Sequence, residues 1–402
     1  MRKPINPPGG RCNDPRSPRT LLPNLSRRGL LRALPGALLA AQWPRVQASP
    51  LTSTGPGSAE RWLSACGDSS ETFGLGWLDA ATNSHGRVGG GFRGHAVLPH
   101  PSRRKSVLYL ARRPGTQALE IDTTSGKQVA GFTCESGKHL LGHGCFSLDG
   151  RALFTTEADI DSGAGLIVVR DAADYRVLAQ WSSGGVGPHD LCPIPDGKTL
   201  VVANGGILTH PDSARQPLNL DTMRSSLTYI DTATGRSLGE FLLEEPKSSI
   251  RHLAVGVDGT VAFGVQLQRQ VAQHNRPVPL TGLHRPGAKL ELLPSPDTVT
   301  TALHDYIGSV AICSGSGTVG FTSPRGNVAA FWRIRGSEFA GYHRLRDVCG
   351  IAVSPARQAF VLSNSFGELR QLDTTTLRER REERLRLPGY RWDNHLLIME
   401  TT

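Results

Sequence analysis

Five histidines stand at matched places in the sequence, each directly before or within a short apolar run. They are His95, His143, His189, His252 and His395. Gly308 and Cys349 stand at similar runs, and the seven positions are separated by 48, 46, 63, 56, 41 and 46 residues. Imidazole and thiolate groups are common protein ligands of copper, iron and zinc. Histidines brought together could therefore bind a transition metal, transfer protons or, when protonated, bind an anion.

A repeat of about fifty residues runs through the chain, and this period is typical of the blades of a β-propeller. Each repeat carries further short runs rich in β-branched and aromatic residues, separated by Asp-Gly and Thr-Gly turns. Such runs predict four strands per repeat. We therefore predict an all-β fold, a seven-bladed β-propeller. The alternatives are a large β-sandwich or two β-domains.

The two ends of the repeat region are predicted to share one blade. The last repeat has a single strand-like run, 396–399, and three runs without a partner lie at 63–66, 73–78 and 87–92. We expect these N- and C-terminal strands to close the last blade together. Such closure leaves no unpaired sheet edge at the seam.

The predicted fold places the histidines. In a propeller, the residue just before the innermost strand of each blade faces the same end of the central channel. We therefore predict that the five histidines converge there as ligands of a transition metal, iron or copper, with Cys349 at the matching place in a sixth blade. The structural alternative is that each histidine only hydrogen-bonds to the backbone of the next blade.

Two stretches interrupt the period, residues 205–226 and the proline-rich residues 268–301. Long insertions in repeat folds usually decorate one face, where binding happens. Our candidate cofactor-binding residues are therefore His210, Asn219 and Arg224 of the first insertion, with Arg251 and Cys349 beside the histidines. Ordinary turn chemistry explains Asn219 equally well.

Residues 1–48 differ from the rest of the chain. They hold nine basic residues and one acid, with the run Ser26-Arg27-Arg28-Gly29-Leu30-Leu31-Arg32 before a short apolar stretch and small residues at 46–48. This order is typical of a twin-arginine export signal; a disordered basic tail is the alternative. We expect a signal peptide at 1–48, a propeller at 49–402 and a periplasmic location.

Charge and composition limit the function classes. The whole chain carries 45 Lys and Arg against 35 Asp and Glu. Without residues 1–48 these become 45 − 9 = 36 and 35 − 1 = 34, a net charge of +2, so a nucleic-acid partner is not expected. No apolar run reaches the roughly 18–20 residues of a spanning helix, so no integral membrane segment is expected.

The remaining motifs point to no particular reaction. The sequence has no GxSxG elbow, HExxH motif or phosphate-binding glycine loop. Outside residues 1–48 it has six cysteines and no CxxC pair. Isolated buried thiols are expected for most of them, although disulfides stay open.

Several ordered motifs together resemble a known family, the domain-of-unknown-function family 1513 of exported bacterial proteins. The motifs are Gly94-His95-Ala96-Val97, Ala111-Arg112-Arg113-Pro114-Gly115, Gly142-His143-Gly144, Gly187-Pro188-His189, Thr209-His210-Pro211-Asp212-Ser213, Leu218-Asn219-Leu220-Asp221-Thr222-Met223, Ile250-Arg251-His252-Leu253, Asp347-Val348-Cys349-Gly350 and Arg391-Trp392-Asp393-Asn394-His395. The resemblance covers essentially the whole chain after residue 63. It implies a seven-bladed propeller associated with periplasmic iron-uptake proteins.

These observations lead to one main functional expectation. The chain is predicted to be a monomeric, periplasmic, metal-associated propeller in iron acquisition or handling, and more a binding protein than an enzyme. A non-enzymatic interaction scaffold is one alternative. An enzyme acting on a small metabolite, such as an oxidoreductase or a lactonase-like propeller, is the other.

Overall fold

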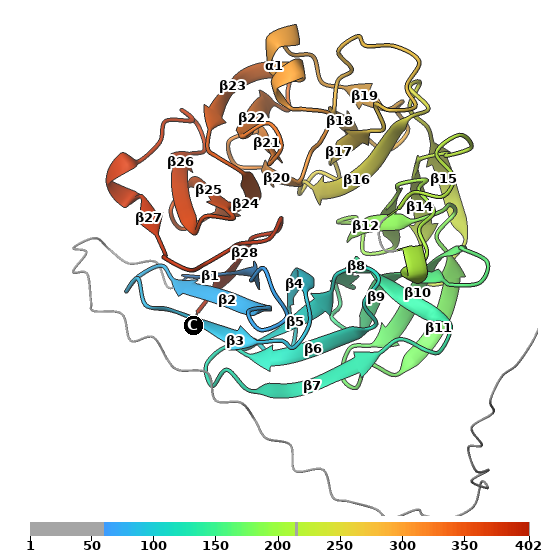
Figure 1. The fold of residues 1–402 in the computed structure, drawn as a ribbon, viewed down its shortest axis with the longest axis horizontal. Helices are drawn as coiled ribbons and strands as arrows, with labels where there is room; N and C mark the ends of the chain where they lie inside the picture. Colours follow the sequence, from blue (N-terminus) through green and yellow to red (C-terminus); the bar gives the residue numbers. More distant parts are fainter. Residues whose placement is uncertain (1–59, 214–215, 402) are drawn as a thin grey trace, which may run out of the picture. The chain divides into compact units, whose positions relative to one another are not determined.

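Seven four-stranded antiparallel sheets surround a common axis in the computed structural model (Figure 1). The structure describes residues 60–213 and 216–401, so the predicted signal at 1–48 lies outside the described residues. Each sheet is one blade, and its strands follow one another from the axis outward. This confirms the predicted all-β, seven-bladed propeller. Within the described residues, no helix is long and apolar enough to cross a membrane.

The strands of the first four blades follow directly in the chain. Blades 1 and 2 consist of β4 (Gly94–Pro99), β5 (Ser106–Ala111), β6 (Gln117–Asp122), β7 (Gln128–Thr133), β8 (Lys138–Phe146), β9 (Ala152–Asp159), β10 (Gly165–Asp171) and β11 (Val177–Ser182). Blades 3 and 4 consist of β12 (Pro188–Pro193), β13 (Thr199–Asn204), β14 (Ser226–Asp231), β15 (Ser237–Phe241), β16 (Ser248–Val255), β17 (Val261–Leu267), β18 (Thr281–His284) and β19 (Glu291–Leu292).

The remaining blades complete the circle. Blades 5 and 6 consist of β20 (Ser309–Cys313), β21 (Thr318–Ser323), β22 (Val328–Arg333), β23 (Glu338–Arg344), β24 (Val348–Ser354), β25 (Ala359–Asn364), β26 (Glu368–Asp373) and β27 (Leu385–Arg386). Blade 7 consists of β28 (Leu397–Glu400), β1 (Glu60–Cys66), β2 (Gly74–Asp79) and β3 (His85–Gly89). In the described part of the chain, three short helices lie between strands, α1 (Asp297–Ala302), η1 (Pro211–Ser213) and η2 (Arg381–Glu383).

Blade 7 joins the two ends of the described chain, as the sequence predicts. Strand β28 pairs antiparallel with β1, from Glu60 opposite Glu400 to Leu63 opposite Leu397. The buried carboxylate of Glu60 accepts hydrogen bonds from the Ser354 hydroxyl of blade 6 at 2.9 and 2.7 Å. Blade 7 is therefore tied both within its own sheet and to its neighbour.

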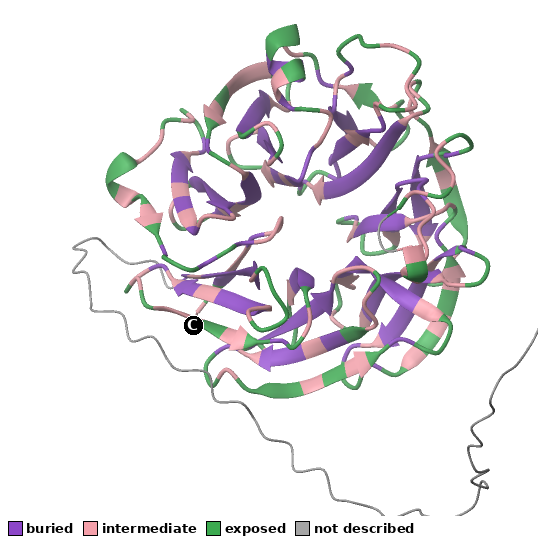
Figure 2. Ribbon diagram, viewed as in Figure 1, coloured by how far each residue is buried: buried purple, intermediate pink, exposed green. Residues whose placement is uncertain are grey.

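The sequence pattern explains which strands lie inside. Strand β5 (SVLYLA) is buried at all six positions, as expected for a strand covered on both faces. Outer strands such as β11 alternate between half-buried and exposed residues. Figure 2 shows this gradient from the buried inner strands to the exposed outermost ones. The apolar side chains form separate clusters, for example Leu108, Leu110 and Leu153 between blades 1 and 2.

Aspartates shape the recurring turns between the third and fourth strands. The Asp122 carboxylate accepts hydrogen bonds from the backbone N–H groups of Thr124 and Ser125, at 3.0 and 2.6 Å. Asp231 and Asp373 make the same pair of bonds in blades 3 and 6. The carboxylate thus accepts hydrogen bonds from backbone N–H groups within the turn, and these bonds stabilise the turn.

The two predicted insertions differ in kind. Residues 205–213 and 216–225 do leave the sheet, between β13 and β14. Residues 268–301 are only partly an insertion, because β18 and β19 of blade 4 lie within them. These two strands are short, four and two residues, and prolines flank them, so the sequence signal for strands is weak there.

Candidate functional site

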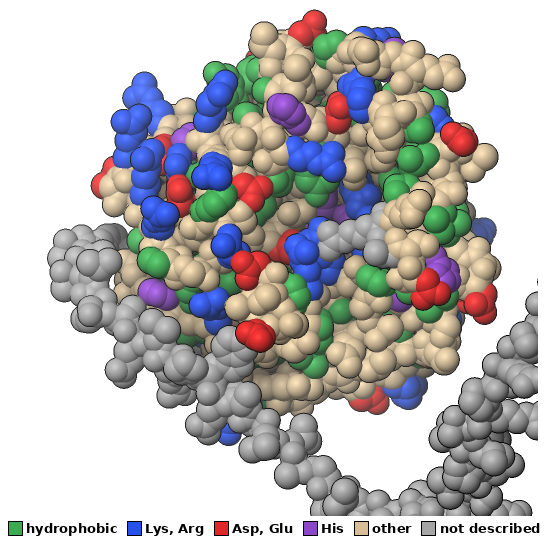
Figure 3. All heavy atoms as spheres, in the orientation of Figure 1, with side chains coloured by type: hydrophobic (Ala, Val, Ile, Leu, Met, Phe, Trp, Pro, Cys, Tyr) green, Lys and Arg blue, Asp and Glu red, His purple; other side chains and the backbone are tan. Residues whose placement is uncertain are grey.

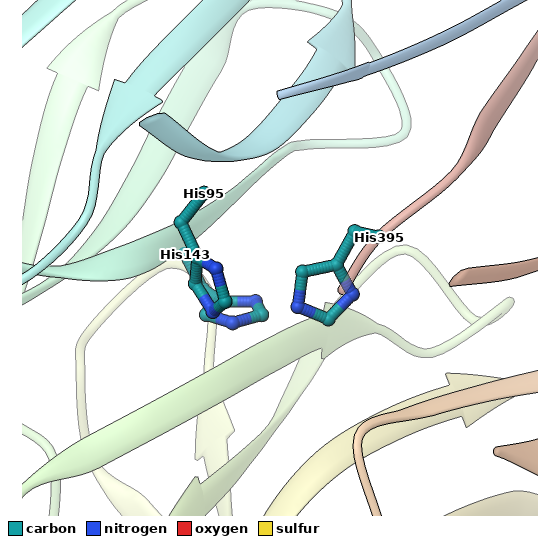
Figure 4. A group of neighbouring side chains, drawn as sticks. All are labelled: His95, His143 and His395. Carbon is teal, nitrogen blue, oxygen red and sulfur yellow. The ribbon is translucent and has the colours of Figure 1, made fainter. Parts of the chain in front are cut away.

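The five predicted histidines do converge. Their rings form a closed circuit in the order His95, His143, His189, His252, His395, and adjacent ring centroids lie 4.7, 4.8, 4.7, 4.9 and 4.6 Å apart. The side chains come from blades 1, 2, 3, 4 and 7. We call this group the histidine cluster. Figure 4 shows three of its rings, those of His95, His143 and His395, turned toward one another.

Irregular strand pairing accompanies most of these positions. The register between the first and second strand shifts at 94–97, 140–144, 188–190, 250–252 and 348–350. His189 is the extra residue in blade 3, whereas Arg251, next to His252, is the extra residue in blade 4. Bulges redirect side chains and are common beside functional sites. Bulging here turns side chains away from the regular sheet toward the axis.

Gly142 allows the backbone of blade 2 to lie against the ring of His95. Gly142 precedes His143 and has a φ of +107°, a conformation that only glycine adopts readily. A Cβ atom there would lie 2.8 Å from Cδ2 of His95. The backbone of blade 2 and the ring of blade 1 can therefore approach each other only because residue 142 is glycine.

Four of the five rings are buried, and that of His395 is half-buried. Burial, aided by neighbouring arginine and imidazole groups, lowers the pKa of His95, His189 and His252 well below its usual value. The same cause lowers the pKa of His395 to about 3. Neutral imidazoles keep a lone pair on one ring nitrogen, and this is the form that binds metal ions.

Two aspartates behind the rings were not among the sequence-predicted site residues. Asp190 Oδ1 lies 3.0 Å from Nδ1 of His143, and Asp393 Oδ1 lies 3.5 Å from Nδ1 of His95. Asp393 is in turn held by Arg112, with contacts of 2.9 and 3.0 Å. Each acid stands close in sequence to a cluster histidine but faces a histidine of another blade. Sequence proximity alone therefore could not reveal the pairing.

Both aspartates stay ionised. Burial raises the pKa of Asp190, but the neighbouring His143 ring and the backbone N–H of Leu253 outweigh that effect and keep it below its usual range. Burial also opposes ionisation of Asp393, whose pKa is nevertheless held well below its usual range, chiefly by Arg112. An ionised carboxylate accepts a hydrogen bond, so it favours the tautomer with the proton on the facing Nδ1.

The partners of the ring nitrogens distinguish His143 and His95 from His189. Nδ1 of His143 is protonated toward Asp190, 3.0 Å away, which leaves its Nε2 lone pair free to bind a metal. Nδ1 of His95 is buried without a hydrogen-bond partner, and the charge of Asp393 at 3.5 Å favours the same tautomer there. In His189, Nδ1 lies 3.2 Å from a terminal nitrogen of Arg251. A guanidinium only donates, so Nδ1 of His189 accepts and the proton of the neutral ring is on Nε2. His189 is therefore set up as an N–H donor and not as a metal ligand.

The ligand geometry fits a metal ion. Two groups place their ligand atoms within 4.8 Å of one another, His95–His143–His395 and His143–His189–His252. Ligand atoms about 2.1 Å from one ion lie at most about 4.2 Å apart, so small ring movements would close either group. The tautomers favour the first group, which we call the His95 triad. It has two carboxylate-backed rings, the arrangement usual for metal-binding histidines.

Ring nitrogens without a hydrogen-bond partner also indicate a metal site. Among the described residues, Nε2 of His143, Nε2 of His395 and both ring nitrogens of His252 are buried without a hydrogen-bond partner. A buried polar atom left unpaired costs about 1–3 kcal/mol. An ion held by the His95 triad would satisfy two of these atoms at once, Nε2 of His143 and Nε2 of His395, so the residues present fit such an ion.

The other predicted site residues have mixed positions. Arg251 is buried and contacts His189, as described above. Cys349 occupies the bulge of blade 6, but its thiol donates to the carbonyl oxygens of Trp392 and Ser363, 3.3 and 3.6 Å away. Burial raises its pKa well above the usual value, so the thiolate that binds metals is disfavoured. Cys349 belongs to neither ligand group.

The structure does not bring the three insertion residues into the cluster. Asn219 fastens the insertion to itself, because its side chain accepts from the Leu208 N–H at 2.7 Å and donates to the Gly206 carbonyl at 2.9 Å. Arg224 is exposed and pairs with Glu240 of the outer strand β15, at 3.0 Å. His210 is half-buried next to Asp212, with an Nδ1 to Oδ2 distance of 3.7 Å.

A polar cavity adjoins the cluster, with a volume of about 230 Å³. Its lining comes from blades 1 to 5 and consists of His95, Arg112, Arg113, Leu141, His189, Arg251, Gln266, Tyr306 and Arg325. We call it the arginine cavity. None of the described residues that line it is acidic. Of these arginines, only Arg251 was predicted from the sequence to be a site residue. The adjacent pair Arg112-Arg113, directly after strand β5, could have indicated two of the others.

The fold and the site together define the class of this protein, a seven-bladed β-propeller with a buried histidine cluster near its axis. Residues 91–399 match the family described as protein of unknown function (DUF1513), and the chain belongs to this family. This confirms the family resemblance. No curated protein matches the sequence significantly.

A solved structure shares the fold. Hydrazine synthase of Kuenenia stuttgartiensis superposes with a TM-score of 0.61, covering 82% of this chain and 99% of that one. The sequences are only 14% identical. The likeness therefore concerns the arrangement of the blades alone.

Proposed function

We propose that this protein is a periplasmic metal-binding propeller that handles iron. The observation that carries the proposal is the closed circuit of five histidines, four of them buried, with ring nitrogens that lack a hydrogen-bond partner. Within it the His95 triad would hold the ion, with Asp190 and Asp393 orienting two of the three rings. Imidazole ligands suit iron, copper, zinc and nickel. The family resemblance favours iron, and copper is the second metal this ligand set suits.

The cellular setting is a proposal that rests on the sequence. The paired residues Arg27 and Arg28 before a short apolar run support export by the twin-arginine route. Periplasmic iron-uptake proteins are the partners we propose, because the family resemblance points to them. The role proposed for this chain is to hold or transfer the ion, with no reaction assigned to it.

Metal analysis of the exported protein tests the proposal. We expect one transition-metal ion per chain after purification and loading with iron(II), copper(II) or zinc(II) in separate samples. His143→Asn should lower the affinity at least about 100-fold, because it removes the ligand that both groups share. His304→Asn is the matched control, since His304 is exposed and has a φ of +48° that asparagine tolerates. Equal metal content in both variants would refute the site.

A further inference from the structure

The arginine cavity is strongly basic and adjoins the histidine cluster. Four of its nine lining residues are arginines, Arg112, Arg113, Arg251 and Arg325. Figure 3 shows Lys and Arg side chains gathered around the centre of the face of the propeller drawn there. Arg112 has the ionised partner Asp393 outside the lining, and none of the described residues that line the cavity carries a carboxylate. An anion entering the cavity would therefore meet a net positive field.

Several of these groups are held in place before any ligand arrives. Asp393 fixes the Arg112 guanidinium through two contacts of 2.9 and 3.0 Å. Arg251 is buried and contacts His189 at 3.2 Å, and the Arg325 guanidinium stacks over the Tyr306 ring at 4.7 Å. Donors that are already oriented lose little conformational freedom on binding. The cavity is thus a built site and not a loose group of surface charges.

His189 supplies a second, independent indication of a ligand. Its side chain is more than nine-tenths buried and lines the cavity. The contact with Arg251 puts the proton on Nε2, and that N–H has no hydrogen-bond partner among the described residues. A buried donor without an acceptor is costly. An anionic acceptor in the cavity would meet this need after a small movement of the ring.

We propose that the arginine cavity binds a small oxyanion that carries more than one negative charge, such as a polycarboxylate. The planar guanidinium fork matches carboxylate and phosphate oxygens, and several arginines in one cavity call for several charges on one ligand. A volume of about 230 Å³ admits a small molecule and no folded partner. The neutral ring of His189 adds one N–H donor without adding charge.

The location also links this anion to the metal site. His95 lines the arginine cavity and belongs to the His95 triad, so a bound anion would place oxygen atoms beside the ion. This link rests on the proposed function, whereas anion binding itself does not. Polycarboxylates chelate iron through such oxygens, and the protein would then hold an ion and its anionic chelator side by side.

Calorimetry on the metal-free exported protein tests the anion site with three probes, citrate, inorganic phosphate and acetate. We expect citrate or phosphate to bind, with acetate at least about tenfold weaker. Arg113→Gln and Arg325→Gln should each weaken binding about tenfold, the usual loss for one charge-assisted hydrogen bond. Arg151→Gln is the control, because its side chain is 87% exposed at a distant turn. Tight citrate with weak phosphate would identify a carboxylate ligand, and the reverse a phosphate ligand.

Two further variants separate this proposal from the proposed function. His143→Asn should lose metal but keep citrate or phosphate binding, whereas His189→Asn should weaken anion binding more than metal binding. Thermal unfolding checks that each variant is folded. Absence of binding by both citrate and phosphate, or unchanged affinity in the Arg113→Gln/Arg325→Gln double variant, overturns the anion site and leaves the metal site untouched.

Discussion

At the scale of single residues, the partner of one ring nitrogen decides what the other nitrogen can do. The carboxylates of Asp190 and Asp393 favour the Nδ1–H tautomer in His143 and His95. Arg251 has the opposite effect on His189. Three identical side chains therefore differ in role: His143 and His95 present Nε2 to a metal, and His189 is a hydrogen-bond donor. Such partners of ligating histidines usually matter almost as much as the ligands themselves.

A substitution at Asp190 tests this division. Asp190→Asn keeps the shape of the side chain but removes the charge that orients His143 and favours its Nε2 lone pair. We expect metal affinity to fall about 10- to 100-fold, measured by competition with a chromogenic chelator at neutral pH. Asp212→Asn, at a side chain that is 92% exposed, should leave the affinity unchanged. An unchanged affinity in Asp190→Asn would show that His143 is oriented by other contacts.

At the scale of elements, the first strand of the blades and its bulge carry the site. The sequence period located the marker positions, because the spacing of blades is a property of the whole repeat. The bulges could not be predicted, since an extra residue in a strand depends on pairing with its neighbour. This is why Arg251 reaches His189, and why Cys349, in the matching bulge of blade 6, instead donates to backbone carbonyls.

The contacts between blades likewise could not be predicted from the sequence. Asp190 lies on β12, next to His189, yet it orients His143 on β8. Asp393, just before β28, faces His95 on β4. Such pairs join residues far apart in the chain, and only the order of blades around the axis brings them together. Closure of blade 7, by contrast, was predictable because the unmatched strand runs at the two ends complement each other.

The bulge of β8 offers a prediction at this scale. Gly142→Ala puts a Cβ atom 2.8 Å from the ring of His95 and also strains a φ of +107°. Gly137→Ala shares the positive φ, at +79°, but its Cβ would meet nothing within 4 Å. We expect both to lower stability, each by about 1 kcal/mol from the backbone alone, with Gly142→Ala clearly worse. Only Gly142→Ala should also weaken metal binding.

Chemical denaturation and chelator competition on the two glycine variants provide the measurement. The pair controls for backbone strain, so any extra effect at position 142 reports the crowding of His95. If the two variants lose the same stability and both bind metal normally, the close approach of blades 1 and 2 does not shape the cluster.

At the scale of the whole molecule, the propeller holds a group of unfavourable buried polar atoms at its axis. The blades are stabilised by apolar clusters between neighbouring sheets, while the axis holds buried imidazoles with unpartnered nitrogens. The fold therefore supports a site that costs stability in the metal-free state. Binding of an ion returns part of that stability, since a ligand that binds only the folded state stabilises it by mass action.

The metal-free protein should consequently lose stability as the pH falls from about 6.5 toward 3. The pKa of His95, His189 and His252 lies well below 6.5 in the folded chain, and that of His395 is about 3. In the unfolded chain each would take up its proton near pH 6.5. The unfolded state then binds more protons throughout this window, so acid favours unfolding by about 1.4 kcal/mol per pH unit for each such histidine.

Denaturant midpoints at pH 7.5, 6.5, 5.5 and 4.5 give the measurement. His252→Asn removes one of these groups and should flatten the dependence, whereas His304→Asn, on the exposed surface, should not. Asp190 and Asp393, whose pKa is also lowered, add to the loss only below about pH 4. Burial lowers the pKa of His100, His139, His284 and His343 as well, so the comparison with His252→Asn isolates the contribution of the cluster. A midpoint that stays constant across this window would mean that the rings can take up protons within the folded propeller. Burial would then not keep His95, His189 and His252 neutral in the folded chain.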